Sequence, residues 1–510
     1  MRPIDIFYQA AQTYHSKIAA IEFDCDLNQK QISYGDLLLN AQALASALQH
    51  ITRTDQPKIA LLTENSIKML TATLAIYACQ GVLIPLTTGY PKHELLKQIH
   101  AVQPDAIIAD THFSNITKAC QIKVFFTQSS HHVAQPSINQ LIEKFKQHQP
   151  FKSNFCPEQT AAIKFTGGSS GRPKAVVQPA RALTAVAICS QKSFELNETD
   201  RFLLATPMTH GAGTFVLPVL GAGGCLMITK NVKADYLLHL MERKKITGFW
   251  LPPTLLYRLI DKQKVLNHNL SALKNLIYGG AGLTPSRLKQ AAKVFGHALG
   301  VCYGQTEAPM ILTAANSKDA EMVLKGSVGK AAFLSKVAIV NQNGKRLKQG
   351  QIGEIIGRGE LLMKGYLNNP TATKQVIKNG WLHTGDLGYL DENGYLYIKG
   401  RLKEIIISGG FNIYPAEIEA VLSSYTGVLE CCVFGVPDEE WGERVEAAVE
   451  LDHHLEIKPK EIKLFLRKKL GAVRTPKKIH HFKSLPRTSL GKINKTEILH
   501  QLQYDTDALQ

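Results

Sequence analysis

The sequence predicts an α/β protein in which a large N-terminal domain of helix-covered β-sheets precedes a smaller C-terminal domain. Its length of 510 residues exceeds what one hydrophobic core usually supports, so at least two domains are expected. Between Ile32 and Leu203, short apolar runs alternate with helical stretches, which is typical of parallel sheets covered by helices. Beyond Gly326, short strands are separated by glycine-containing turns, and this pattern predicts a small β-rich subdomain.

The first elements can be taken in chain order. Residues 1–17 lack the apolar core of a signal peptide and predict the start of an amphipathic helix. Residues 34–49 predict a helix, and the runs 59–62 and 106–109 predict strands. The most apolar stretch, 69–86, is interrupted by glycine and proline, so it predicts a buried helix and a strand rather than a membrane span. We therefore expect no transmembrane segment and a cytoplasmic location.

Later elements are marked by their turns. Residues 161–165 predict a strand that ends in a glycine-rich loop, and residues 276–279 predict a strand that ends in a glycine turn. A helix should begin after that turn, capped near Thr284. The pairs Asn343-Gly344 and Asn393-Gly394 predict hairpins.

The composition is that of a globular protein with a basic charge balance. Hydrophobic residues make up 45% of the chain and charged residues 20%, which argues against disorder. The net charge of +17 favours anionic partners such as a nucleotide, CoA, nucleic acid or an acidic membrane. The nine cysteines have no C-x-x-C spacing, so they predict neither a disulfide framework nor a zinc site. Cys431 and Cys432 lie in an apolar run and are expected in the core.

The strongest chemical signal is the loop within residues 164–175, which can wrap a polyphosphate. Glycine N–H groups, hydroxyls and cations supply the donors and the charge. These residues are Thr166, Gly167, Gly168, Ser169, Ser170, Gly171, Arg172 and Lys174. The loop is not a Walker A motif, because Pro173 precedes its lysine and Ala175 follows it. Taken alone, a Gly/Ser-rich surface turn is an equal alternative.

Further motifs follow in a fixed order. They are Tyr-Gly-Gln-Thr-Glu at 303–307, Thr-Gly-Asp at 384–386, Gly-Arg-Leu-Lys-Glu at 400–404 and Pro-Arg-Thr-Ser-Leu-Gly-Lys at 486–492. With the loop and the opening pattern at 61–66, they resemble the adenylate-forming superfamily, in its acyl-CoA synthetase branch of AMP-dependent CoA ligases. The resemblance runs along most of the chain. It implies an ATP-dependent ligase that converts an acid and MgATP to acyl-adenylate and pyrophosphate, and then forms acyl-CoA and AMP.

The resemblance also implies roles for individual residues. Lys492 would offset charge at the α-phosphate, Glu307 would bind Mg²⁺, and Thr166 and His210 would complete the catalytic set. Tyr303 would stack on the base, and Asp386 would accept hydrogen bonds from the ribose hydroxyls; a turn aspartate that caps its own backbone is the alternative for Asp386. The full ATP/AMP set is Thr166, Gly167, Gly168, Ser169, Ser170, Gly171, Lys174, Gly279, Gly280, Ala281, Tyr303, Gly304, Thr306, Asp386, Arg401 and Lys492.

The acyl group is expected beside His210, which matches the family's acyl-site histidine. The other acyl candidates are Gly211, Tyr278, Gly282 and Met310. Met208 and Thr209 stand where the family often has bulky residues. Without the resemblance, a lone histidine in an apolar stretch is more often a satisfied core residue. A medium- or long-chain fatty acid is preferred over an aryl acid, and the lack of an acidic residue between Pro207 and Cys225 disfavours amino acids.

The chain is divided into an N-terminal domain, 1–399, a hinge, 400–403, and a mobile α+β C-terminal domain, 404–510. Residues 405–419 resemble the CoA-ligase branch in particular. CoA is therefore expected at Ser408, Gly409, Gly410, Trp441, Lys477 and Lys478. Rotation about Lys403 would bring first Lys492 and then the glycine loop to one active site, whereas the alternative for Lys403 is an ordinary exposed linker residue.

Other functions stay open at this point. An aryl-acid CoA ligase, an adenylation enzyme that loads a carrier protein and a luciferase-like oxygenase share these motifs. A regulatory binding protein on a degenerate ligase scaffold is disfavoured by the intact Glu307, Asp386, Lys403 and Lys492. The stretch 458–483 carries ten Lys or Arg and one Glu, but we expect no nucleic-acid partner. Monomer and homodimer are both compatible with the sequence.

Overall fold

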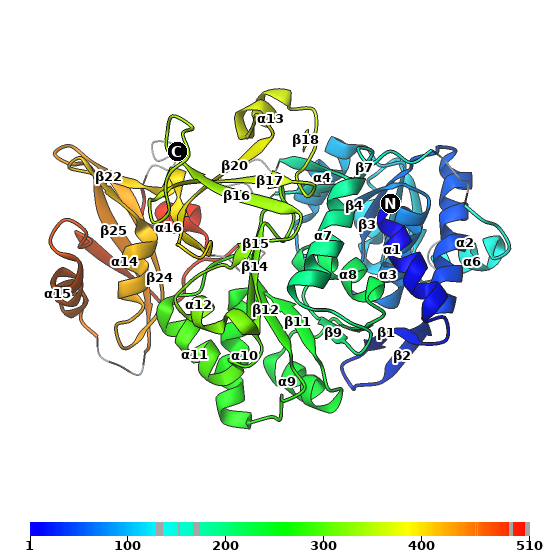
Figure 1. The fold of residues 1–510 in the computed structure, drawn as a ribbon, viewed down its shortest axis with the longest axis horizontal. Helices are drawn as coiled ribbons and strands as arrows, with labels where there is room; N and C mark the ends of the chain where they lie inside the picture. The colour runs from blue at the N-terminus through cyan, green and yellow to red at the C-terminus, as the bar shows by residue number, and fades with distance from the viewer. Residues whose placement is uncertain are drawn as a thin grey trace.

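The computed structural model confirms the α/β prediction, with a large N-terminal domain and a small C-terminal domain (Figure 1). It describes residues 1–128, 136–150, 154–166, 174–453, 455, 457–488 and 493–504. Within these ranges the strands form four β-sheets. Helices pack around the two larger sheets, which lie in the N-terminal domain.

The first large sheet holds the glycine-rich loop and has the strand order β18-β8-β7-β4-β3-β5-β6. Strands β7, β4, β3, β5 and β6 are parallel, whereas β8 and β18 are antiparallel additions. Almost all residues of β3 and β5 are buried, as expected for parallel strands covered on both faces. The strands are β3 (Lys58–Leu62), β4 (Val82–Pro85), β5 (Ala106–Ala109), β6 (Lys123–Phe126), β7 (Thr160–Phe165), β8 (Ala175–Pro179) and β18 (Gly365–Tyr366).

The second large sheet has the order β15-β14-β13-β12-β11-β9-β10-β1-β2, and its central strands are parallel. The strands are β1 (Ile18–Phe23), β2 (Gln29–Ser33), β9 (Arg201–Leu204), β10 (Cys225–Thr229), β11 (Gly248–Leu251), β12 (Asn275–Gly279), β13 (Leu299–Tyr303), β14 (Thr313–Ala315) and β15 (Lys330–Ala331).

The remaining strands form two smaller sheets. The β-rich subdomain contains β16 (Ser335–Val340), β17 (Gly353–Gly359), β19 (Ile377–Lys378), β20 (Trp381–Leu390) and β21 (Leu396–Arg401). The C-terminal sheet contains β22 (Ile406–Ser408), β23 (Phe411–Ile413), β24 (Val428–Asp438), β25 (Gly442–Leu451) and β26 (Lys478–Phe482). The chain passes from one sheet to the other through the short 3-10 helix η4 (Leu402–Glu404), which includes the predicted hinge residue Lys403.

The N-terminal domain carries most of the helices. They are α1 (Pro3–Thr13), α2 (Tyr34–Thr52), α3 (Ile67–Ala78), α4 (Lys92–Val102), α5 (Ser114–Thr117), α6 (Ile138–Phe145), α7 (Ala180–Ser193), α8 (Val216–Gly221), α9 (Ala234–Arg243), α10 (Pro253–Leu266), α11 (Pro285–Phe295), α12 (Ala320–Leu324) and α13 (Pro370–Val376). Three 3-10 helices join them: η1 (Thr111–Phe113), η2 (Gly211–Phe215) and η3 (Ser317–Asp319). The C-terminal domain adds α14 (Pro415–Leu422), α15 (Pro459–Leu470) and α16 (Lys495–Gln501).

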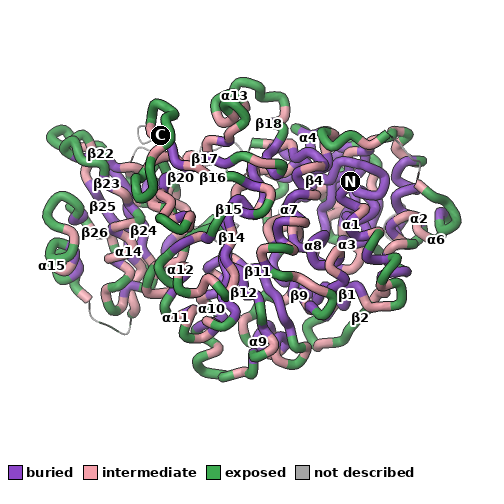
Figure 2. The backbone as a smooth tube through the Cα atoms, viewed as in Figure 1, coloured by how far each residue is buried: buried purple, intermediate pink, exposed green. Residues whose placement is uncertain are grey.

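The main hydrophobic core lies between the two large sheets. It combines side chains from both sheets with side chains from α1, α2, α3, α7 and α8. Figure 2 shows this part as mostly buried, whereas α15 at the outer end of the C-terminal domain is mostly exposed or intermediate. The phosphate-loop strand β7 borders this core, so the loop begins from a rigid base.

The element predictions are confirmed where the structure describes them. The helix 34–49 and the strand 161–165 correspond to α2 and β7, and the side chain of Thr284 caps α11 by accepting a hydrogen bond from the Arg287 N–H. Gly344 and Gly394 take positive φ in the two predicted hairpin turns. All nine cysteines are free, and Cys431 and Cys432 are buried in β24. No described helix combines the length and the apolarity needed to cross a membrane.

Candidate active site

The base of the phosphate loop is closed by a short hydrogen-bonded pair. The Thr166 N–H donates to the Lys174 carbonyl at 2.9 Å, and the Lys174 N–H donates to Thr166 Oγ1 at 3.3 Å. These bonds extend the β7–β8 hairpin and fix where the loop leaves and re-enters the sheet. The predicted ligands Gly167, Gly168, Ser169, Ser170 and Gly171, and also Lys492, lie outside the described residues.

Tyr366, which lies outside the predicted motifs, contacts both Glu307 and Lys174. The Tyr366 hydroxyl donates to Glu307 Oε1 at 2.8 Å, and Lys174 Nζ lies 4.9 Å from the centre of the Tyr366 ring. Burial and the neighbouring Glu307 carboxylate raise the pKa of Tyr366, so its phenol stays protonated and acts as a donor. Glu307 of the 303–307 motif therefore lies near Lys174, at the described end of the 164–175 segment.

Asp386 is the centre of a buried polar cluster. Its Oδ2 atom accepts hydrogen bonds from Tyr303 Oη and from Gln305 Nε2, both at 2.7 Å. Its Oδ1 atom lies 3.2 Å from Arg401 Nε. Burial and this carboxylate hold the pKa of Tyr303 well above its usual value. Strand β20 thus carries Asp386 to side chains from β21 and the end of β13, and not to a cap on its own turn.

The turn after β12 leaves open space on one side of the backbone. Gly280 has φ of +83°, and a Cβ added at Gly280 or Gly282 would meet no atom of the described residues within 4 Å. Gly279 is different, because an added Cβ would lie 3.0 Å from Cys302 Sγ and 3.1 Å from Trp250 Nε1. A flat ligand can therefore lie against the outer part of this turn, while its beginning is tightly packed.

The predicted acyl wall is assembled around Trp250. An added Cβ on Gly211 would lie 2.2 Å from the Trp250 ring, so only glycine fits there without movement. His210 lies next to this contact, with Nδ1 at 2.8 Å from Thr209 Oγ1 and Nε2 at 3.3 Å from Thr87 Oγ1. Tyr278 is buried, and Met310 places its sulfur 3.3 Å from Cys302 Sγ. Trp250 was not predicted, and no local pattern marks it.

The CoA candidates gather in the C-terminal domain. The Gly409 N–H donates to the Trp441 carbonyl at 2.8 Å, and Lys477 Nζ lies 5.2 Å from the centre of the Trp441 ring. Ser408 is buried, whereas Gly410 and Lys478 are exposed. Figure 1 shows β22, which ends at Ser408, at the outer left edge and far from β7. In this structure β22 therefore lies far from β7, the strand that precedes the phosphate loop.

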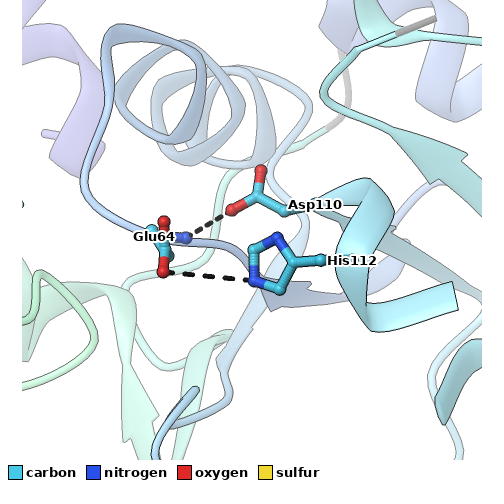
Figure 3. Close-up of side chains that lie close together, drawn as sticks. All are labelled: Glu64, Asp110 and His112. Carbon is cyan, nitrogen blue, oxygen red and sulfur yellow. Dashed lines mark hydrogen bonds and ion pairs between the residues drawn. The ribbon is translucent and has the colours of Figure 1, made fainter. Parts of the chain in front are cut away.

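A group of possible metal ligands lies elsewhere, at Glu64, Asp110 and His112 (Figure 3). Asp110 accepts from the Glu64 N–H at 2.7 Å and from Thr127 Oγ1 at 2.5 Å. Glu64 lies 2.8 Å from Lys230 Nζ. Since these contacts already compensate both carboxylates, we assign no metal to this cluster.

Comparisons with known proteins cover nearly the whole chain. A family model described as AMP-binding enzyme matches residues 7–367, and one described as AMP-binding enzyme C-terminal domain matches residues 417–492. The chain is 36% identical over 349 residues to medium/long-chain-fatty-acid–CoA ligase FadD8 of Mycobacterium tuberculosis; the match covers 67% of this chain and 61% of FadD8. It is 31% identical to indoleacetate–CoA ligase of Aromatoleum aromaticum, over 92% of this chain and 93% of that protein.

Solved structures give the same extent of similarity. ATP-bound MatB from Rhodopseudomonas palustris superposes with a TM-score of 0.89 and 28% identity, covering 99% of this chain and all of that one. The o-succinylbenzoate CoA synthetase MenE from Bacillus subtilis, in complex with its acyl-adenylate intermediate, gives a TM-score of 0.85 and 25% identity, with 97% of each chain covered.

Proposed function

This chain belongs to the AMP-binding enzyme family, in the acyl-CoA ligase branch of the adenylate-forming superfamily, and we propose how its residues perform that chemistry and which acid it activates. It is an ATP-dependent acid–CoA ligase. The acid attacks the α-phosphate of ATP and releases pyrophosphate, and the CoA thiol then displaces AMP from the acyl-adenylate. The observation that carries this function is the polar cluster that Asp386 forms with Tyr303, Gln305 and Arg401.

The chain's own residues divide the work of the first step. Asp386 and Tyr303 hold the nucleoside, and Lys174 with the loop backbone holds the phosphates. Lys492 neutralises the negative charge that gathers at the α-phosphate, where one preorganised donor is worth about 10²–10³ in rate. His210 and Trp250 border the acyl group.

Glu307 is the residue that would hold Mg²⁺. Tyr366 donates to its Oε1 atom, and no described residue donates to Oε2, so one carboxylate oxygen is open for a hard cation. When bound, the ion offsets phosphate charge. Tyr366 fixes the orientation of the carboxylate.

The second step uses the C-terminal domain. The distance between β22, which ends next to Gly409, and β7 in Figure 1 supports a rotation about Lys403 between the two half-reactions. Proline fixes φ near about −65° and removes a backbone donor. Lys403→Pro should therefore keep adenylation but lose thioester formation from supplied acyl-adenylate by orders of magnitude. Formation of acyl-CoA at the parent rate would contradict the hinge.

The identity of the carboxylic acid substrate is a more specific part of the proposal. A medium- or long-chain fatty acid is the first candidate, supported by the similarity to FadD8. An aryl acid is the second, favoured by the open space beside Gly280 and Gly282 and by the similarity to indoleacetate–CoA ligase. A cytoplasmic location is part of the same proposal.

The direct test is ATP–pyrophosphate exchange with butyrate, octanoate, palmitate, benzoate, indoleacetate, ferulate and 2-succinylbenzoate, repeated with CoA. We expect exchange with at least one acid, and AMP and acyl-CoA after CoA is added. Lys492→Ala should lose exchange yet still convert supplied acyl-adenylate to acyl-CoA. Near-normal exchange by that variant would contradict the role of Lys492, and no acid-dependent exchange by the folded parent protein would contradict the reaction.

A further inference from the structure

One lysine outside the predicted site, Lys164, is half-buried and faces an apolar cavity. Lys164 lies on β7, on the face of the strand that borders the main core. Its ammonium group has no hydrogen bond or ion pair with any described residue. Nonetheless, it lines two adjoining cavities with volumes of about 30 and 20 Å³.

The surroundings of these cavities are almost entirely apolar. Both cavities share Tyr77, Lys164, Gly213 and Val216. The remaining walls are Leu61, Met69, Thr73, Leu83, Pro85, Leu183, Val186, Met208, Thr214, Leu217 and Pro309. No acidic side chain lies among them. Since a cavity needs only about 10–15 Å³ to hold one water, each can hold a small polar group.

Tyr77 is the second polar group in this space. Its side chain is buried on α3, and its hydroxyl has no hydrogen-bond partner among the described residues. Thr73 and Thr214 also reach the cavities, but their hydroxyls already donate to backbone carbonyls of Met69 and Gly211. The cavities therefore present two unused donors, one of them cationic.

An unpaired ammonium in apolar surroundings is unfavourable. Burial lowers the pKa of Lys164 to about 8, so the group is still mostly protonated at pH 7. Buried charges are normally paired with an opposite charge, because desolvation of a single charge costs several kcal/mol. The missing partner must therefore come from outside the described residues, and an anionic group of a ligand would supply it.

The walls of both cavities come from segments that neighbour the predicted site residues in sequence. Lys164 lies two residues before Thr166, which directly follows β7. Gly213 and Thr214 belong to η2, which begins next to His210. Pro309 lies between Glu307 and Met310. The cavity walls thus come from the segments that hold the phosphates and the acyl group.

On this basis we propose that Lys164 and Tyr77 form the far end of the acyl pocket and bind a second carboxylate of the substrate, so that this ligase activates a dicarboxylic acid. The inference rests on the proposed function and specifies its substrate class, whether the skeleton is aliphatic or aromatic. One carboxylate goes to the α-phosphate, and the other enters the cavity beside the Lys164 ammonium, with the Tyr77 hydroxyl as an additional donor.

The test compares acids that differ only in the second carboxylate. Pyrophosphate exchange is measured for glutarate against pentanoate, adipate against hexanoate, and terephthalate against benzoate. For at least one pair we expect kcat/KM for the diacid to exceed that for the monoacid at least 10-fold. Lys164→Met should reverse this preference, because a neutral side chain of similar length favours an apolar substrate end. Tyr77→Phe should lower kcat/KM for the diacid alone by about 3- to 10-fold.

Lys192→Met is the matched control, because it removes the same charge from the exposed face of α7 and should leave the preference unchanged. Equal kcat/KM for every diacid and its monoacid, or equal loss for both in Lys164→Met, would overturn the inference while leaving the ligase function intact.

Thermal unfolding with ATP and each acid gives a readout that does not need turnover. A rise in Tm that depends on the diacid and disappears in Lys164→Met would support the anion site even if exchange were absent with every acid, in which case only the proposed reaction fails. No diacid-dependent rise in the parent protein, together with no exchange, would overturn both.

Discussion

Two charges of opposite sign, on the buried Asp386 and the half-buried Lys164, are treated in opposite ways by this fold. Asp386 has three partners from different strands and loops, within 2.7 to 3.2 Å of its oxygens. Lys164 has none among the described residues, and apolar side chains surround it. The difference indicates that the nucleotide side of the site is preorganised before a ligand arrives, whereas the Lys164 cavity is completed only when an anion enters it.

The largest expected effect comes from removing the charge of Asp386. Asp386→Asn removes the ion pair with Arg401. It also replaces the carboxylate that accepts hydrogen bonds from Tyr303 and Gln305 with a neutral amide. Breaking a buried, hydrogen-bonded charge costs about 3–5 kcal/mol, so kcat/KM for ATP in pyrophosphate exchange should fall at least ~100-fold. Asp235→Asn, which removes an exposed carboxylate paired with Lys262, is the control. A loss under tenfold would show that the cluster is not the nucleotide site.

The second effect is on stability and has the opposite sign. Lys164→Met should raise the free energy of unfolding at pH 7 by about 1–3 kcal/mol, because it removes a half-buried charge that has no partner among the described residues. Folding lowers the pKa of this ammonium from 10.5 to about 8, so the unfolded chain binds more protons between these values. The destabilisation of the parent protein by this charge is therefore greatest below pH 8 and disappears as the pH rises toward 10.5.

Urea unfolding of the parent and Lys164→Met at pH 7 and pH 9.5 measures this difference. The advantage of the variant should shrink at the higher pH. A variant that is less stable than the parent at pH 7 would mean that Lys164 is paired within the protein, and the contrast with Asp386 would no longer hold.

The smallest effect isolates one neutral donor of the Asp386 cluster. Tyr303→Phe keeps the aromatic ring but removes the hydroxyl that lies 2.7 Å from Asp386. Since one hydrogen bond contributes about 0.5–1.5 kcal/mol, KM for ATP should rise about 3- to 10-fold, with little change in kcat. An effect as large as that of Asp386→Asn would assign the hydroxyl a direct part in the reaction.

The local features of this chain were readable from its sequence. The alternation of apolar runs predicted the strands β3, β5 and β7, and turn residues predicted the hairpins at Gly344 and Gly394. The order of the motifs identified the family. These signals are local, because they depend on backbone preferences and on spacing within a few residues.

The tertiary structure decided which side chains meet, and no local pattern encodes that choice. Tyr366 and Glu307 are hydrogen-bonded although they lie 59 residues apart in the sequence, and Tyr303 and Asp386 lie 83 residues apart. The residues that surround Trp250 and Tyr77 come from strands and helices far apart in sequence. Lys164 stood at the edge of the glycine-rich motif, yet its isolation became visible only after β7, α3, η2 and α8 had packed around it. The physical reason is that burial and the presence or absence of a partner are properties of the packed core, not of a residue and its sequence neighbours.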